Sequence, residues 1–299
     1  MTDSEHHRLV MALTAFRVVR TPGKIATILQ EGGIGALAEL FEGLSTGEKS
    51  SLCQEASELH DKAIRVVMAG DSDFPATLIR NRRPLAPVIF YWGERSLLHA
   101  PSIGMCGARS VTPLGIRAAH ACGEEVSIRN MAVVSGYAKG VDTVTHLAAL
   151  GIGGKTVIVL AEGFNHFRIK QDFRGKFDPD RVLVISQFPP SQPWGAYAAM
   201  TRNSLIYGLS QALVVVEAGS KGGTLAAGKG ALKIGRPVFV LNFGEETPEG
   251  NRILISSGGF PIRSREELGR AIAEHALKNG TSESVSLIGD PQQEALPFE

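Results

Sequence analysis

From residue 65 onward the sequence alternates short apolar runs with helical patterns, and this alternation restricts the fold more than any other feature. Two of the runs, residues 157–160 and 213–216, contain no polar residue. A strand has such a composition when helices cover both faces of its sheet. Repeated strand–helix units of this kind predict an α/β fold with a doubly wound, mostly parallel, Rossmann-like sheet.

The individual elements follow from where each run begins and ends. Apolar residues make up 43% of the 299-residue chain, which is enough to build the core of such a sheet. We expect strands over residues 65–69, 88–92, 103–107, 131–135, 156–161, 182–188, 212–217 and 237–242. We expect helices over residues 112–125, 142–150, 203–209, 224–234 and 266–278.

The pattern divides the chain into three parts. Residues 1–62 predict a small helical N-terminal module, in which apolar residues such as Leu9 and Leu13 recur at helical spacing. Residues 63–280 form the Rossmann-like core, and residues 281–299 form an acidic, flexible tail. Two roles are open for the N-terminal module: contact with nucleic acid through helix-hairpin-helix-like turns, or packing and dimerisation.

Charge is distributed unevenly along the chain. The formal net charge is +1, but residues 63–280 hold 25 Lys and Arg against 17 Asp and Glu. Residues 1–62 hold six against nine, and residues 281–299 hold four acids and no cation. A basic centre between acidic ends indicates a polyanionic partner, although ordinary surface lysines would also explain the excess. The acidic N-terminal module favours packing over contact with phosphates.

Three glycine-containing loops, each with one cation, follow predicted strands and precede predicted helices. Loops at the carboxyl ends of parallel strands open onto one crevice, where helix N-termini offer unpaired N–H groups and a partial positive charge. The loops therefore predict one phosphate-binding site. Its candidate residues are Gly107, Arg109, Ser135, Gly136, Lys139, Gly140, Lys221, Gly222, Gly223 and Thr224.

Two of these loops hold side chains with more than one possible role. Thr112 and Pro113 suit the start of the helix behind Arg109, so an anion there would meet a helix N-terminus and a guanidinium together. A surface arginine in a turn is the simpler alternative. We expect Asp142 to cap the next helix; with His146 it also suggests acid–base chemistry, but a cap and a structural histidine explain the pair better.

The usual catalytic and metal-binding patterns do not occur in the sequence. The loop at 221–224 is not a P-loop, because no G-x-x-x-x-G-K-[ST] is found. Neither G-x-S-x-G nor H-E-x-x-H occurs, and no cluster of His, Asp and Cys has ligand spacing. We therefore expect no metal and no cofactor. Glu217 is the one alternative catalytic residue.

The cysteines and the apolar runs indicate a cytoplasmic protein without membrane association. The three cysteines are odd in number, and no two form C-x-x-C, which argues against a disulfide framework and a structural zinc site. The first residues lack the basic start and apolar stretch of a secretory signal. No apolar run approaches the roughly 20 residues that a membrane span needs.

Residues 164–177 interleave four cations and one acid with four phenylalanines directly after a predicted strand. Aromatic rings alternating with positive charge suit an extended single strand of nucleic acid, which makes Phe164, Phe167 and Phe173 candidates for base stacking. A long loop whose aromatic side chains pack into the core explains the segment equally well.

Together, these segments resemble the DprA/Smf family of DNA-processing proteins. That family shows a G-S-R turn, an S-G-x-A-[KR]-G-[IV]-D loop, an R-N-R-I-I-x-G-L-S helix and a V-V-E-A strand. This chain has G-A-R at 107–109, S-G-Y-A-K-G-V-D at 135–142, R-N-S-L-I-Y-G-L-S at 202–210 and V-V-E-A at 215–218. The match spans about residues 65–260 in a consistent order.

The resemblance implies a core that binds single-stranded DNA without sequence preference and has no catalytic step. It also implies transfer of the strand to the recombinase RecA in DNA uptake, natural transformation and recombination, and a homodimer. By the same resemblance Arg109, Lys139 and Arg202 belong to the DNA pocket, with Asn203 next to Arg202. Lys221 is a candidate only through its own loop.

Several positions depart from the family pattern. Ala108 replaces the serine of G-S-R, which removes a phosphate donor, and Ser204 replaces the second arginine of R-N-R, which removes a cation. About twenty residues follow the core, so we expect no C-terminal winged-helix domain.

Two other functions are open for the same crevice. Glu217 with the loop at 221–224 is similar to the nucleotide phosphoribohydrolases, in which an acid assists N-glycosidic cleavage of a nucleoside monophosphate. The usual P-G-G-x-G-T-x-x-E loop is incomplete here. A nucleotide-sensing domain would instead hold a small signalling nucleotide.

The tail carries one short motif. Gln293 to Phe298 (Q-E-A-L-P-F) fits the loose Q-x-x-L-x-F pattern of peptides that dock into bacterial sliding clamps. A glutamine and two apolar anchors on a flexible end suit a hydrophobic groove, so a sliding clamp is a further candidate partner.

Overall fold

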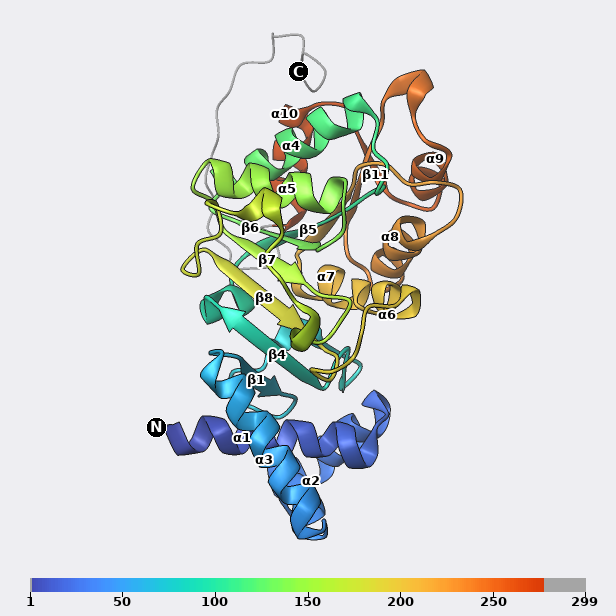
Figure 1. The fold of residues 1–299 in the computed structure, drawn as a ribbon. Helices are drawn as coiled ribbons and strands as arrows, with labels where there is room; N and C mark the ends of the chain where they lie inside the picture. Colours follow the sequence, from blue (N-terminus) through green and yellow to red (C-terminus); the bar gives the residue numbers. More distant parts are fainter. Residues whose placement is uncertain (1, 277–299) are drawn as a thin grey trace.

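The computed structural model describes residues 2–276, which form a nine-stranded sheet, a short hairpin and the helices around them (Figure 1). The strands of the sheet are β1 (Arg65–Met68), β4 (Val88–Gly93), β5 (Ser102–Cys106), β6 (Ala132–Gly136), β7 (Thr156–Val159), β8 (Val182–Ser186), β9 (Ala212–Val215), β10 (Val238–Leu241) and β11 (Phe260–Ile262). The hairpin pairs β2 (Ile79–Arg80) with β3 (Arg83–Pro84). The α-helices are α1 (Thr2–Thr14), α2 (Pro22–Glu42), α3 (Thr46–Asp61), α4 (Pro113–Ile128), α5 (Val141–Gly151), α6 (Ala196–Thr201), α7 (Asn203–Leu209), α8 (Gly223–Lys233), α9 (Glu249–Ser256) and α10 (Arg265–Ala271).

The order of the strands creates a reversal in the middle of the sheet. Across the sheet the strands run β1-β4-β8-β7-β6-β5-β9-β10-β11. All pairs from β8 to β11 are parallel, whereas β4 and β1 extend the sheet antiparallel beyond β8. The chain builds outward from β5 to β8 and then returns to place β9 on the other side of β5. Open α/β sheets bind ligands beyond the carboxyl ends of the strands at such a reversal.

Helices cover both faces of the parallel part of the sheet. Figure 1 shows α4, α5 and α10 on one face and α7 and α8 on the other. Side chains of β5 alternate accordingly: Ile103 and Met105 pack into the core under α4, and Cys106 belongs to the opposite core. These two cores confirm the doubly wound, mostly parallel α/β fold expected from the apolar runs.

The N-terminal helices pack against the antiparallel edge of the sheet. Leu9 and Leu13 of α1 are buried in one continuous core with Val67 of β1 and Phe90 of β4. Within α2 the chain changes direction at Gly33, whose φ of 60° is a left-handed conformation that favours glycine. The division into a module over residues 1–62 and a core over 63–280 stays a prediction.

The observed elements lie close to the expected ones, with identifiable exceptions. The expected helix over 203–209 is α7, and the other four expected helices correspond to α4, α5, α8 and α10. The sequence did not reveal β11, because its three residues include a proline and are too few to form a pattern. Helices α6 and α9 were missed as well; both are short. The expected acidic tail and the clamp-like motif at Gln293 to Phe298 lie outside the described residues.

Candidate functional site

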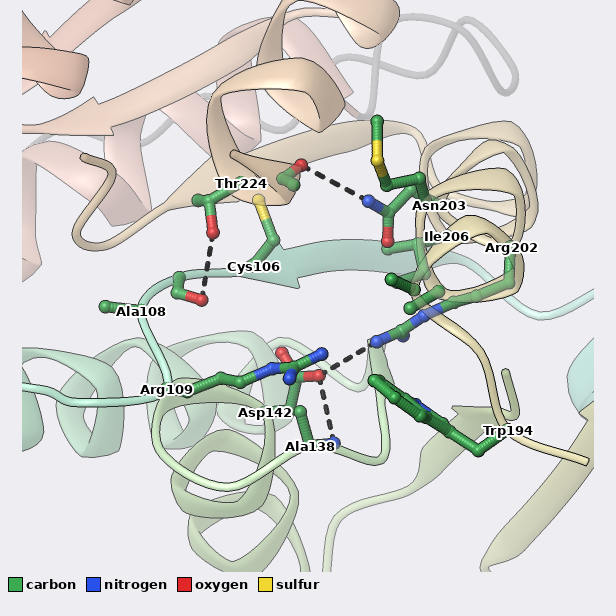
Figure 2. A pocket seen from close by; sticks show the side chains of 15 residues that line it. Cys106, Ala108, Arg109, Ala138, Asp142, Trp194, Arg202, Asn203, Ile206 and Thr224 are labelled. Atoms are coloured by element: carbon green, nitrogen blue, oxygen red, sulfur yellow. Dashed lines mark hydrogen bonds and ion pairs between the residues drawn. The ribbon is translucent and has the colours of Figure 1, made fainter. Parts of the chain in front are cut away.

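A cavity of about 440 Å³ lies beyond the carboxyl ends of β5 and β9, at the reversal of strand order. Four separate parts of the chain, within residues 106–109, 138–142, 194–206 and 223–224, contribute its walls (Figure 2). Of the residues expected from the sequence, Gly107, Arg109, Arg202, Asn203, Gly223 and Thr224 line it. The winding of the sheet therefore brings together segments that are about a hundred residues apart in the chain.

Arg202 reaches this cavity from between α6 and α7 and is only 6% exposed. Its Nη2 donates to Oδ2 of Asp142 at 3.2 Å, but its Nε and Nη1 have no partner among the described residues. The guanidinium packs directly on Gly136, and any β-carbon at position 136 would overlap it. Gly136 thus supports the site by leaving room for a buried cation with unused donors.

Asp142 organises the second loop, but it is not the N-cap expected from the sequence. Helix α5 begins at Val141, so the cap is Gly140, with a φ of 80°, and Asp142 lies in the first turn. The Asp142 carboxylate accepts the N–H of Ala138 at 3.2 Å as well as the Arg202 bond, and lies 3.1 Å from the Ser135 hydroxyl. A carboxylate in the first turn still stabilises the helix, because it lies near the partial positive charge of the helix N-terminus.

Arg109 and Trp194 lie against each other in the wall of the crevice. The Arg109 guanidinium lies 5.4 Å from the centre of the Trp194 ring, a cation–π arrangement. In Figure 2 the side chains of Arg109 and Arg202 extend toward the middle of the cavity from opposite walls. Two further cavities share Arg109, Ala138 and Trp194 with the first, so the three are contiguous.

The second cavity, of about 260 Å³, holds polar side chains from the segment after β7. Its walls include Tyr137, Glu162, His166, Arg168 and Lys170. Burial raises the pKa of Glu162 and lowers that of Lys170 from their ordinary values. The Lys170 Nζ lies 4.1 Å from the centre of the Tyr137 ring and donates to the Tyr137 carbonyl.

The third cavity, of about 350 Å³, adds Ser110 and Lys139. Around the three cavities there are five cations and two carboxylates, so the crevice as a whole is electropositive. The cations are Arg109, Lys139, Arg168, Lys170 and Arg202. Positive charge collected at the carboxyl ends of strands favours binding of a polyanion.

Glu217, the alternative catalytic residue, does not line any of these cavities. It is 6% exposed, and its two carboxylate oxygens accept from the N–H and the hydroxyl of Thr112. The Thr112 oxygen in turn accepts the N–H of Gly115 and caps α4, as its position before Pro113 predicted. The structure therefore gives Glu217 a part in holding the start of α4, outside the walls of the three cavities.

The third glycine loop is only partly in the crevice. Gly223 and Thr224 line the main cavity, but the Thr224 hydroxyl donates to the Gly107 carbonyl at 3.0 Å and joins the two loops. Gly222 has a φ of 111°, which allows the turn into α8. Lys221 is exposed and does not belong to the walls of the three cavities.

Two of the three base-stacking candidates are wrong, because the rings of Phe164 and Phe173 belong to the core. Phe173 is fully buried and Phe164 is 6% exposed, so neither offers a face to a ligand. Phe167 is half-buried between the rings of Trp92, Tyr137 and Phe164. Three cations of the same segment, Arg168, Arg174 and Lys176, are exposed, whereas Lys170 is half-buried against Tyr137. The sequence pattern therefore combined side chains of the core with charged surface side chains.

Two buried groups near the crevice have structural roles. His146 is fully buried; its Nε2 donates to the Gly136 carbonyl at 2.7 Å, and its Nδ1 lies 2.6 Å from the Thr156 hydroxyl. Burial lowers its pKa to about 4, so the ring is neutral at pH 7. Cys106 lines the main cavity, and burial raises the pKa of its thiol. The burial of His146 and its contacts with Gly136 and Thr156 favour the structural interpretation of this histidine.

Comparison with known proteins identifies the family. The model of the DNA recombination-mediator protein A family matches residues 65–273, which is more than half of the chain. The chain belongs to the DNA recombination-mediator protein A family. It is 32% identical to the protein Smf of Escherichia coli K12 over 284 residues, which cover 91% of this chain and 74% of Smf.

Members of this family with the name DprA are also similar. The DNA processing protein DprA of Streptococcus pneumoniae R6 is 31% identical over 191 residues, or 61% of this chain and 66% of that protein. The solved S. pneumoniae DprA structure superposes with a TM-score of 0.66 at 25% identity, over 90% of this chain and 93% of that one. DprA of Helicobacter pylori has a TM-score of 0.61 at 19% identity, over 70% and 96%, and shows the same fold.

Two of the positions that depart from the DprA/Smf motifs, Ala108 and Ser204, lie in or near the crevice. Ala108 lines the main cavity, where the family's serine would offer a hydroxyl. Ser204 is half-buried, and its hydroxyl donates to the Thr201 carbonyl at 2.8 Å. The crevice of this family member therefore relies on fewer side-chain donors than the family pattern supplies.

Sequence reasoning missed Trp194, Lys170 and Arg168 as individual wall residues. Lys170 and Arg168 were within the segment singled out for its charge, but nothing local separated them from the other cations. Trp194 stands in a stretch of Pro, Ser and Gln without periodicity. A lone tryptophan in a polar loop is the one signal that could have marked it.

Within residues 2–276, no group of three or more His, Cys, Asp and Glu side chains is arranged to hold a metal ion. The cysteines at 53, 106 and 122 are free. In the same part of the chain, every helix is too short or too polar to cross a lipid bilayer.

Proposed function

We propose that this protein binds single-stranded DNA without sequence preference, through the electropositive crevice around Arg109, Lys139 and Arg202. The sugar–phosphate backbone follows the contiguous cavities, and the cations neutralise its charge. No base-specific contact is needed for this mode of binding, because phosphates are the same at every position.

One observation carries the proposal: cations from separate parts of the chain, among them Arg109, Lys139 and Arg202, converge on one crevice at the reversal of strand order. Arg202 adds a buried guanidinium with two unpartnered nitrogen donors. Leaving such donors unsatisfied costs about 1–3 kcal/mol each, so an anionic oxygen nearby stabilises the site. A relative with the same fold agrees, because the H. pylori structure concerns the single-stranded DNA binding mode of DprA.

The biological role follows from the family. Its description as a recombination mediator supports presentation of the bound strand to a RecA-type recombinase in DNA uptake and recombination. We include a homodimer and a cytoplasmic location in the proposal, and we assign the protein no catalytic step. The engagement of both Glu217 oxygens by Thr112 supports the last point.

The direct test compares charge reversal at the carboxyl ends of the parallel strands with charge reversal at their amino ends. Lys139→Glu places an acid in the crevice, whereas Lys155→Glu makes the same change beside the amino end of β7, at the opposite edge. Fluorescence anisotropy with labelled oligo-dT should show about tenfold weaker binding for Lys139→Glu and wild-type affinity for Lys155→Glu. Oligo-dA and a mixed sequence should give the same result. Equal affinity of Lys139→Glu and the wild type would refute the proposed crevice.

A further inference from the structure

Trp194 is a large aromatic side chain that the fold leaves open at the centre of the crevice. It is 54% exposed, although its ring adjoins all three cavities. Folded chains rarely leave a tryptophan this open without a partner. The residue precedes α6 in the connection between β8 and α7.

The ring borders two cavities of different character. On one side the main cavity has an apolar wall built from Ala196, Ala199, Met200 and Ile206. On the other side the second cavity is lined by Tyr137, Glu162 and Lys170, whose polar groups can accept and donate hydrogen bonds. The Arg109 guanidinium lies 5.4 Å from the centre of the Trp194 ring, so a positive charge lies next to the aromatic surface.

We propose that Trp194 is the base-stacking residue of the crevice and separates two successive nucleotides of a bound single strand. An unpaired base stacks on the indole face that Arg109 leaves open, while Arg109 meets the adjacent phosphate. This inference rests on the proposed function and adds to it a reason for choosing single strands. In a duplex both faces of each base are already covered by neighbouring bases, so the ring has no partner there.

The chain offers a matched control on the next helix. Tyr197 in α6 is 83% exposed, but it does not line any of the three cavities. It is therefore an open aromatic residue close in sequence to Trp194 and outside the proposed path. Trp194→Phe keeps a stacking surface, whereas Trp194→Ala removes it.

The experiment uses two strands of equal length, oligo-dT and a fully abasic oligonucleotide that keeps the phosphates. Base–aromatic stacking predicts that Trp194→Ala weakens oligo-dT binding about 5- to 150-fold and leaves abasic binding unchanged. Trp194→Phe should retain most of the affinity, and Tyr197→Ala should bind both strands as the wild type does. Circular dichroism and thermal unfolding check that each variant is folded.

Fluorescence gives an independent readout, because the chain has two tryptophans. Trp92 is half-buried against Phe167 and Phe177, and Trp92→Phe leaves Trp194 as the only indole. Oligo-dT should quench this emission strongly, and the abasic strand should bind without comparable quenching.

The outcomes separate this inference from the proposed function. Wild-type protein that binds neither strand would overturn the proposed function. Binding of oligo-dT with unchanged affinity after Trp194→Ala would overturn the stacking role and leave the function in place. An equal loss on oligo-dT and on the abasic strand would also overturn stacking, because it would assign Trp194 to holding Arg109 instead.

Discussion

At the residue scale, the crevice depends on a buried cation and on the small residue beneath it. Arg202 is held by Asp142 on one side and fits against Gly136, where a β-carbon would collide with it. A buried ion pair adds little net stability, but removing one partner leaves an uncompensated charge. The pair is therefore better explained by fixing the direction of the guanidinium than by a gain in folding energy.

His146 predicts how this region responds to acid. Its pKa is about 4 in the folded protein, below the ordinary value of 6.5, chiefly because of burial. Asp142 acts against this shift, while Arg202 and Lys170 act with it. The unfolded chain therefore takes up the proton first, and stability falls as pH drops from about 6.5 toward about 4.

Urea unfolding at pH 7.5 and pH 5 measures this effect. The wild type should lose about 2 kcal/mol more of its unfolding free energy between these pH values than His146→Gln, which carries no titrating ring. The same loss in both proteins would assign the acid sensitivity to other groups.

At the element scale, the loops after β5 and β6 are locked to each other by backbone contact. Gly140 has a φ of 80°, and a β-carbon there would overlap the Ala108 carbonyl and lie 2.7 Å from the Arg109 carbonyl oxygen. The Val141 N–H also donates to the Ala108 carbonyl at 3.2 Å. The close approach of Gly140 to the 108–109 backbone thus fixes the loop of Lys139 relative to the loop of Arg109.

Gly140→Ala should disturb both stability and binding. The strained backbone costs about 1–3 kcal/mol, and the displaced loops should weaken oligo-dT binding as well. Gly175→Ala is the control, since Gly175 has a similar φ of 79° but open space around a β-carbon. It should lose stability without losing affinity, measured by urea unfolding and anisotropy. Wild-type affinity in Gly140→Ala would mean that the two loops are not coupled.

At the scale of the whole molecule, the winding of the sheet decides where charge collects. Strands β5 and β9 are neighbours although about a hundred residues separate them, and their following loops face one crevice. The connection from β8 to β9 then brings Arg202 and Trp194 across the same opening. Only this arrangement gathers cations from residues 63–280 in one place, so that they produce a positive electrostatic potential in the crevice.

Salt dependence tests the arrangement as a whole. If three to five phosphates are neutralised, log affinity for oligo-dT should fall against log salt with a slope of about −2 to −3.5. Arg109→Ala and Lys139→Ala should each make the slope less steep by about 0.7, and together by about twice that. Titrations between 50 and 300 mM salt measure these slopes, with Lys155→Ala as the unchanged control. A wild-type slope near zero would show that charge does not drive binding.

The sequence by itself determined the strands and helices of the core and the cations of its loops. Runs such as residues 213–216 and the Thr112–Pro113 helix start are local signals, which need only neighbouring residues to take effect. Placement in the crevice could be predicted for Arg109 and Lys139 because a loop at the carboxyl end of a parallel strand has a known position in this kind of sheet.

Only the tertiary structure decided which side chains are buried and what they contact. Phe173 belongs to the core, Glu217 is bound to Thr112, and the Trp194 ring is exposed. The neighbouring sequence of these three residues does not reveal which of them is buried. Burial depends on segments far away in the chain, since a side chain is covered by whatever the fold packs against it. For the same reason, the sequence did not reveal that Arg202 is a buried cation whose Nε and Nη1 have no hydrogen-bond partner among the described residues.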